Sequence, residues 1–272
     1  EQQIVLPTSY QRLTLNWPEL NPLFEAFKNR DYCTFMHSVA VHSTAQNLLR
    51  DLQLRAALST LHFQEIQNRS PFWMLHDIGK TAADIDQATA QQIVFPTHPD
   101  TRTQYQKARH WIHPHMSASV IKLWSNTTSE KTKHSAKKWA QLSYLHDNKL
   151  NPFLDDRHKI QLGASDKVAL FLFSLSDTAM AMGLPRQNKE NIHSADEIRS
   201  ALLRKYLTDH VLKTLFPAQN TAELRNYILA SVLDSVQKLQ NQYPREIWTT
   251  PPVPLNQEKT KLLDTIILDS WQ

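Results

Sequence analysis

An adjacent histidine and aspartate, His76 and Asp77, stand in an apolar stretch of the chain, residues 72–80, whose sequence is FWMLHDIGK. The apolar residues around them leave no polar face, which predicts a buried helix that carries both side chains into the interior. Burying a carboxylate beside an imidazole costs several kcal/mol unless a cation compensates. Neutral imidazole and carboxylate both bind divalent first-row metals, so this stretch predicts a metal site.

Two adjacent residues cannot complete a coordination sphere, so further ligands are expected elsewhere in the chain. Four candidates lie in comparably apolar surroundings: His37, His113, His146 and Asp177. Counted with the His76–Asp77 pair, successive candidates are 31 to 39 residues apart. Each gap suits one helix and a connection, so each helix of a bundle could direct one ligand toward a shared centre.

Helical periodicity places three of these candidates on apolar faces. In a helix predicted for residues 32–54, His37 shares a stripe with positions 41, 45 and 48, whereas His42 lies off it and is expected to be structural or at a pocket rim. His146 aligns with positions 139 and 142, and Asp177 with positions 170, 173 and 174 of a long helix expected from Ser165. A carboxylate on so apolar a helix is also expected to need a cation.

The fourth candidate, His113, precedes Pro114, and proline is favoured at the first position of a helix. We therefore expect a helix to begin at Pro114, with His113 at its N-cap and its ring directed into a site. The polar residues 125–138 contain four lysines and are predicted to form a solvated connection rather than an anion-binding patch.

Composition favours an all-α fold, because 272 residues contain only three glycines and few segments alternate with a period of two. The one cysteine, Cys33, excludes an internal disulfide and a cysteine-built zinc site, which fits a reducing compartment such as the cytoplasm. No apolar run approaches the roughly 18 to 20 residues that span a bilayer. The net charge of +4 agrees with an anionic substrate but is too small to indicate nucleic-acid binding.

Three regions are expected along the chain. Residues 1–30 form a lead-in segment, in which residues 1–22 are expected to be irregular with one short helix. Residues 31–190 form the metal-binding helical domain, and residues 191–272 form a C-terminal helical extension packed on the bundle. A second helix of the domain is expected over about residues 56–68. In the extension, the pairs Ser194–Glu197 and Asn220–Glu223 match capping boxes, and an amphipathic helix is expected near the end. These helices are expected to cover the bundle or to mediate self-association as a homodimer, with docking of a partner as the alternative.

The order H…HD…H…H…D, with residues 76–80 spelling HDIGK, resembles the HD superfamily of metal-dependent phosphohydrolases. Within it, the resemblance is closest to the branch that contains the HD-GYP cyclic-dinucleotide phosphodiesterases, and it covers about residues 30–190. It implies an HD-domain helical bundle with the metal ligands His37, His76, Asp77, His113, His146 and Asp177. Six such ligands suit two octahedral divalent ions, iron or manganese, bridged by Asp77 and a hydroxide.

The resemblance also assigns phosphate contacts. It gives Lys80 the role of holding a phosphate oxygen, and Arg186 and Lys189 fall at offsets that match a basic phrase of the family after Asp177. The chain departs from the HD-GYP pattern at several positions. It lacks the tandem histidine and the Gly-Tyr-Pro segment, Cys33 stands where some members carry a glutamate for a third metal, and Ser117 replaces a glycine.

These features predict a metal-dependent phosphohydrolase, in particular a phosphodiesterase that hydrolyses a cyclic dinucleotide or another nucleotide phosphoester with a metal-activated hydroxide. Asp77 and Lys80 would be catalytic, and a phosphorylated small molecule would be the ligand. Two alternatives remain at this stage. The same ligand set is found in mixed-valent di-iron oxygenases of the superfamily, and loss of the GYP segment would also suit a non-catalytic module that binds a nucleotide or a partner.

Overall fold

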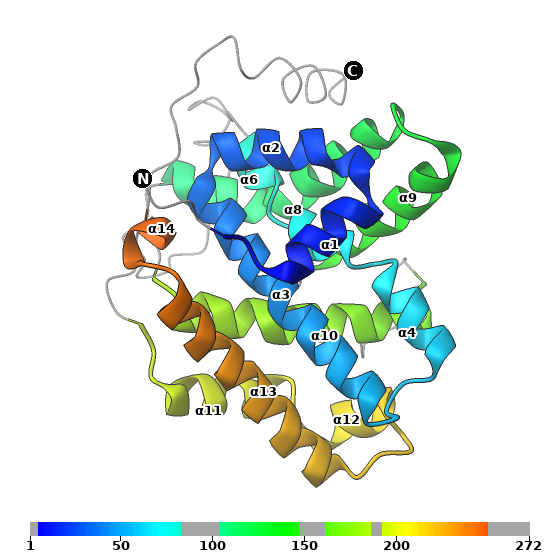
Figure 1. Cartoon of the computed structure of the whole chain (residues 1–272), viewed down its shortest axis with the longest axis vertical. Helices are drawn as coiled ribbons and strands as arrows, with labels where there is room; N and C mark the ends of the chain where they lie inside the picture. The colour runs from blue at the N-terminus through cyan, green and yellow to red at the C-terminus, as the bar shows by residue number, and fades with distance from the viewer. Residues whose placement is uncertain (1–4, 83–103, 147–160, 186–191, 250–272) are drawn as a thin grey trace.

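The computed structural model describes residues 5–82, 104–146, 161–185 and 192–249. Within these residues every regular element is a helix and there is no strand, which confirms the predicted all-α class (Figure 1). The helices are α1 (Thr8–Asn16), the 3-10 helix η1 (Pro18–Leu20), α2 (Asn21–Arg30), α3 (Tyr32–Leu54), α4 (Thr60–Gln67), α5 (Pro71–Leu75), α6 (Gly79–Ala82), α8 (Gln104–Ser125), α9 (Glu130–Leu145), α10 (Ala164–Gly183), α11 (Ala195–Lys205), α12 (Asp209–Leu215), α13 (Thr221–Gln242) and α14 (Arg245–Thr249).

The long helices α3 and α10 pack against each other and form the middle of the molecule (Figure 1). α3 begins after Asp31, whose carboxylate accepts a hydrogen bond from the Thr34 N–H at 2.9 Å and caps the helix. The bounds of α3 agree with the predicted helix over residues 32–54. Both long helices are buried over most of their length, so polar side chains on them can lie in the interior of the molecule.

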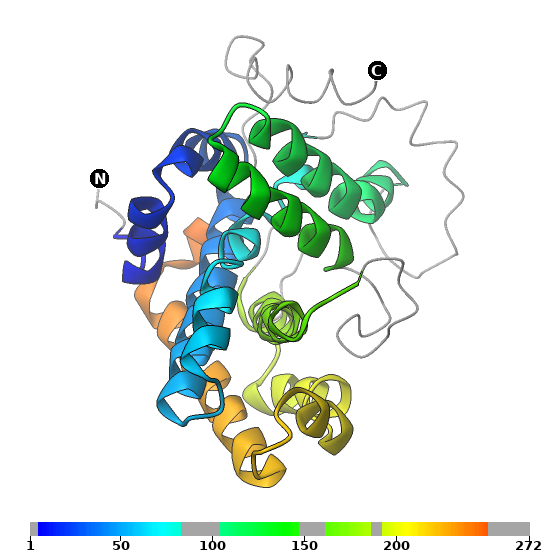
Figure 2. The ribbon, with the colours of Figure 1, turned by 90° about the vertical axis from the view of Figure 1, so that its right-hand side faces the viewer.

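The other helices cover this pair from three sides. α8 and α9 lie side by side, α6 packs on α8, and α5 packs on both α3 and α9 (Figure 2). α13 packs on α3 and α10, α11 and α12 pack on α10 and α13, and α14 packs on α3. α1 and α2 pack on the remaining side of α3. One continuous apolar core includes residues from all of these groups.

The first 30 residues are more regular than expected. Instead of an irregular lead-in with one short helix, residues 8–30 form α1, η1 and α2. Their apolar residues Tyr10, Leu13, Phe24 and Phe27 are buried in the same core as α3. The prolines that favoured an irregular segment occupy positions before or at the start of helices, where a missing N–H costs little.

Three predicted helix starts are wrong. The second helix begins at Thr60 rather than near residue 56, because Ser59 caps it and Ala56 has a positive φ of 54° in the preceding turn. Pro114 does not begin a helix and lies inside α8, so His113 is not an N-cap. Residues 125–138 are not a solvated connection throughout, because Ser129 caps α9 and the chain is helical from Glu130.

The C-terminal capping predictions are confirmed in part. Ser194 and Glu197 form the expected capping box of α11, and Asn220 accepts hydrogen bonds from the N–H groups of residues 222 and 223 at the start of α13. Two helices lie between these two caps, because α11 ends at Lys205 and Thr208 caps α12. The amphipathic helix expected near the end lies outside the described residues. No helix within the described residues has the length and apolar character that crossing a bilayer requires.

Candidate metal centre

His76, Asp77 and Ile78 form a turn between α5 and α6, here named the HD turn. The predicted helix through this stretch therefore ends at Leu75, although the predicted burial is confirmed, because His76 is 1% and Asp77 2% exposed. Ser117 on α8 holds the turn: its Oγ accepts a hydrogen bond from the Gly79 N–H at 2.9 Å and donates one to the His76 carbonyl oxygen at 2.5 Å. These bonds satisfy two backbone groups that the helix break leaves without helical partners.

Gly79 allows α6 to approach α8 closely. A Cβ atom at this position would lie 2.4 Å from the His113 carbonyl oxygen, 2.4 Å from the Ser117 backbone nitrogen and 2.8 Å from the Met116 Cβ. A side chain of any size would thus push apart the two helices. This contact brings His113 next to the HD turn, in a helix that continues through Pro114 despite the loss of one helical N–H.

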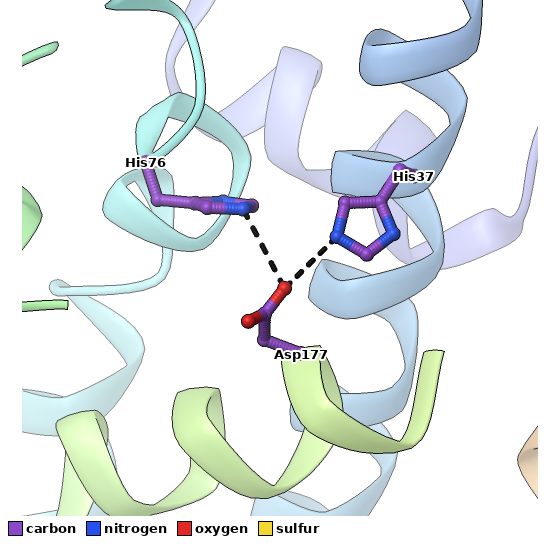
Figure 3. Close-up of side chains that lie close together, drawn as sticks. All are labelled: His37, His76 and Asp177. Atoms are coloured by element: carbon purple, nitrogen blue, oxygen red, sulfur yellow. Dashed lines mark hydrogen bonds and ion pairs between the residues drawn. The ribbon is translucent and has the colours of Figure 1, made fainter. Parts of the chain in front are cut away.

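The structure brings all six predicted ligands together in two groups of three. His37, His76 and Asp177 form one group, with the His37 Nε2 2.9 Å and the His76 Nε2 3.9 Å from the Asp177 Oδ1 (Figure 3). Asp77, His113 and His146 form the other. Within each group, the nitrogen or oxygen atoms that could bind an ion lie within 4.8 Å of one another.

The Asp77 carboxylate lies between the two groups. Its Oδ2 is 3.3 Å from the His76 Nε2, while its Oδ1 is 3.2 Å from the His113 Nε2 and 3.8 Å from the His146 Nε2. One carboxylate oxygen thus faces each group. The Lys80 Nζ lies 2.5 Å from the Oδ2. Within the described residues, Lys80 is the one lysine that contacts this carboxylate.

Backbone carbonyls orient two of the histidines. The Nδ1 of His76 lies 2.9 Å from the Trp73 carbonyl oxygen, and the Nδ1 of His146 lies 2.5 Å from the Ser143 carbonyl oxygen. A carbonyl oxygen can only accept, so each Nδ1 carries the proton, and in a neutral ring the Nε2 presents a lone pair to the centre. Histidines that bind metals commonly donate their other N–H to such a carbonyl.

Charges within the cluster shift the protonation of its members. Burial works to raise the pKa of the Asp77 carboxyl, but Lys80, His76 and His113 together hold it well below its usual range. Burial also opposes ionisation of Asp177, and the hydrogen bond from His37 lowers its pKa below the usual range. Burial and the neighbouring histidines lower the pKa of His146 well below its usual range. The centre therefore contains two carboxylates and a neutral imidazole, which are forms that bind cations.

An ion fits these residues. The buried Nε2 of His76 has no hydrogen-bond partner among the described residues, and in the neutral ring its lone pair faces carboxylate oxygens of Asp77 and Asp177. The Nε2 atoms of His113 and His146 also converge, at 2.9 Å. The lone pairs of these histidine nitrogens repel one another and also repel the two carboxylates, unless a proton or a metal ion lies between them. Both buried His/Asp groups could therefore hold a metal ion.

The surroundings leave one side of the centre accessible. The ring of Phe173 on α10 packs against His76, with ring centroids 4.7 Å apart, and against His146 at 5.6 Å. By contrast, the Asp177 side chain is 33% exposed and the Lys80 side chain is 23% exposed. A small molecule could thus reach the side of the centre that bears an anion and a cation.

Not every predicted site residue belongs to this cluster. Arg186 and Lys189 lie outside the described residues. His42 is buried on α3, and its ring lies 6.1 Å from that of Trp73, so it is not one of the six. The sequence missed the positioning roles of Ser117 and Phe173, although the replacement of the family's glycine by serine was a visible signal for the first.

Comparison with known proteins adds no assignment: no protein-family model, curated protein or solved structure matches this chain. The support for a metal centre therefore comes from the geometry of the cluster and not from similarity to known proteins.

Proposed function

We propose that the chain is a metal-dependent phosphohydrolase of the HD type, and specifically a phosphodiesterase that acts on a nucleotide phosphoester such as a cyclic dinucleotide. The observation that carries this proposal is the position of Asp77. One of its oxygens faces His76 and the other faces His113 and His146, as expected of a carboxylate that bridges two ions.

Each group would hold one divalent ion, with Asp77 shared between them, and iron or manganese would suit the mixed imidazole and carboxylate ligands. Two such ions would supply an activated water as nucleophile and neutralise charge on the phosphoryl oxygens. The protein positions its ligands through the HD turn, through α8 and α9, and through the long helices α3 and α10.

Lys80 would bind the substrate. Its ammonium group stands 2.5 Å from Asp77 and its side chain is partly exposed, so it can turn a donor toward a phosphoryl oxygen at the accessible side of the centre. Phe173 would shield the buried side of the centre, because its ring packs on His76 and His146. These positions support hydrolysis of an anionic ester and leave the identity of the ester to experiment.

The first test is the metal content of protein purified without chelator or added metal. Elemental mass spectrometry should find about two ions per chain, and Asp77→Ala should lose both, because this residue faces both groups. His134→Ala, which removes an exposed histidine of α9, is the control and should retain them. Absence of metal after reconstitution with iron or manganese would overturn the proposal.

The second test is turnover of cyclic dinucleotides, cyclic mononucleotides and nucleoside triphosphates by the metal-loaded protein. Lys80→Met should reduce turnover at least about tenfold while the metal stays bound. Lys133→Met is the matched control, because Lys133 also pairs with a carboxylate three residues before it, Glu130, but on the exposed surface. Metal-loaded protein that hydrolyses none of these esters, or that consumes oxygen with a substrate instead, would contradict the proposed reaction.

A further inference from the structure

A cavity of about 710 Å³ opens between α1, α3, α4 and α9, away from the metal centre. None of the six candidate metal ligands lines it. In Figure 1, the helices α1, α4 and α9 lie to the right of α3. Its volume is typical of a site for a small molecule, which usually measures roughly 300 to 1,000 Å³.

The charges that the described residues place around this cavity are all positive. Arg12, Arg50 and Lys131 line it, and no aspartate or glutamate of the described chain does. Within the same part of the chain, none of these three side chains forms a salt bridge. The neighbouring Asp51 does not line the cavity and instead accepts a hydrogen bond from Ser231 on α13 at 3.0 Å. Burial and the nearby Arg12 lower the pKa of Arg50, while the nearby Asp51 carboxylate works to raise it.

Buried polar atoms in the cavity wall also lack partners in the part of the chain that the structure describes. Neither ring nitrogen of His42 makes a hydrogen bond there, and neither does the Oγ of Ser9 or of Ser70. These three side chains are 0%, 7% and 1% exposed, and all of them line the cavity. A buried polar group without a partner costs about 1 to 3 kcal/mol, so native proteins rarely retain several together unless a ligand or water completes them.

The His42 side chain is uncharged at neutral pH. Burial and the nearby Arg50 lower its pKa to about 3, so the ring is neutral and offers one donor and one acceptor. The cavity wall also carries neutral hydrogen-bonding side chains beside its cations, among them the amides of Gln46, Gln53 and Gln67. Apolar residues complete the wall, and the rings of Trp17 and Phe63 are the aromatic members.

We infer that this cavity is a second ligand site, and that it binds a small organic phosphate with an aromatic or apolar group, of the class of a nucleoside phosphate. Three cations match a phosphate, which carries between one and two negative charges near neutral pH, better than a single carboxylate. Arginine can hold its oxygens through two parallel hydrogen bonds. The aromatic and apolar wall would contact the remainder of the ligand.

The inference is tested by calorimetric titration of metal-depleted protein in a chloride buffer without chelator. This condition separates it from the proposed hydrolysis, because the phosphodiesterase reaction requires the metal centre. The probes are inorganic phosphate, pyrophosphate and adenosine monophosphate, with citrate and adenosine as carboxylate and uncharged comparisons. We expect one saturable site for the nucleotide and weaker binding of inorganic phosphate.

Three variants locate the binding. Arg50→Gln and the exposed Lys131→Gln should each weaken nucleotide affinity about tenfold, because each removes one charge from the cavity. Arg55→Gln removes an arginine of the same region that stacks on Tyr227 outside the cavity, and should leave the affinity unchanged. Asp77→Ala should also bind normally.

Several results would overturn the inference. They are no binding of any phosphate at millimolar concentration, affinity unaffected by both Arg50→Gln and Lys131→Gln, and citrate bound as tightly as the nucleotide. Loss of binding in Asp77→Ala would place the ligand at the metal centre instead. The Lys131 variant keeps the test valid if Arg50→Gln folds poorly, because Lys131 lies on the surface of α9.

Discussion

Adding one methyl group at Gly79 tests how the metal centre is held together. In Gly79→Ala, the new Cβ would meet two backbone atoms of α8 at 2.4 Å and the Met116 Cβ at 2.8 Å. These distances are far shorter than van der Waals contact, and the backbone of a packed helix cannot rotate away as a side chain can. Overpacking in a core typically costs about 1 to 3 kcal/mol, and we expect this variant at the upper end of that range.

The expected shift can be measured by thermal unfolding. For a chain of this size, a loss of 1 kcal/mol lowers Tm by roughly 2 °C, so Gly79→Ala should unfold about 6 °C below the wild type. Since relief of the clash must move α6 from α8, Asp77 should also move away from His113. We therefore expect the variant to bind less metal as well, measured as ions per chain.

The other two glycines of the chain provide graded controls. A Cβ at Gly163 would meet only the Asp166 Oδ2, at 3.6 Å, so Gly163→Ala should change Tm by less than about 2 °C. A Cβ at Gly183 would meet the Val236 Cγ1 at 2.4 Å and the Ile198 Cδ1 at 3.2 Å, which are side-chain atoms. Gly183→Ala should thus destabilise to an intermediate extent and keep its metal. A Gly79→Ala protein as stable and as metal-rich as Gly163→Ala would refute this account of the α6–α8 contact.

Three further predictions concern single side chains. Ser117→Ala should lower the free energy of unfolding by about 2 to 3 kcal/mol in denaturant titrations, since two buried backbone groups of the HD turn lose their partner; Ser125→Ala, which loses one bond to its own helix, should cost about 1 kcal/mol. The pKa of His42 is about 3 in the fold against an ordinary value of 6.5, so the unfolded state binds a proton that the native state excludes. Wild-type stability should therefore fall by about 1.4 kcal/mol per pH unit from this residue as the pH drops below about 6, and His42→Asn, but not the control His134→Asn, should remove that slope. Asp177→Asn should reduce the metal content from two ions to one, because it changes one group and leaves Asp77 in place; a variant that still holds two ions would show that Asp177 is not a ligand.

The sequence predicted the class of fold and the long helices well, because burial of apolar stripes dominates both. α3 was predicted at its observed bounds, since Asp31 caps its start and its apolar positions recur with helical spacing. The stripe through His37 is buried as expected. The convergence of six residues was also predictable, but their division into two groups depends on angles and distances between helices, which spacing along the chain does not contain.

The sequence failed where contacts between distant segments override local preference. Pro114 is a strong local signal for a helix start, yet α8 continues through it, and the backbone of α8 at His113 and Ser117 packs closely against Gly79. The break at the HD turn depends likewise on Ser117, which lies 41 residues beyond His76. The proposed ligand cavity was beyond sequence reasoning, because its walls come from four helices and from turns between them.

His37 and His42 show why residue type alone does not assign a role. They lie five positions apart on α3, which places them roughly 140° apart around the helix. His37 meets a carboxylate, with its Nε2 2.9 Å from Asp177, whereas His42 meets no carboxylate of the described chain and lies in the field of Arg50. One helix thus separates a cluster with two carboxylates, suited to cations, from a cavity with three cations, suited to anions. In metal-depleted protein, an added metal ion and an organic phosphate would therefore bind on different faces of α3, and each proposed site can be disabled without removing a side chain from the other.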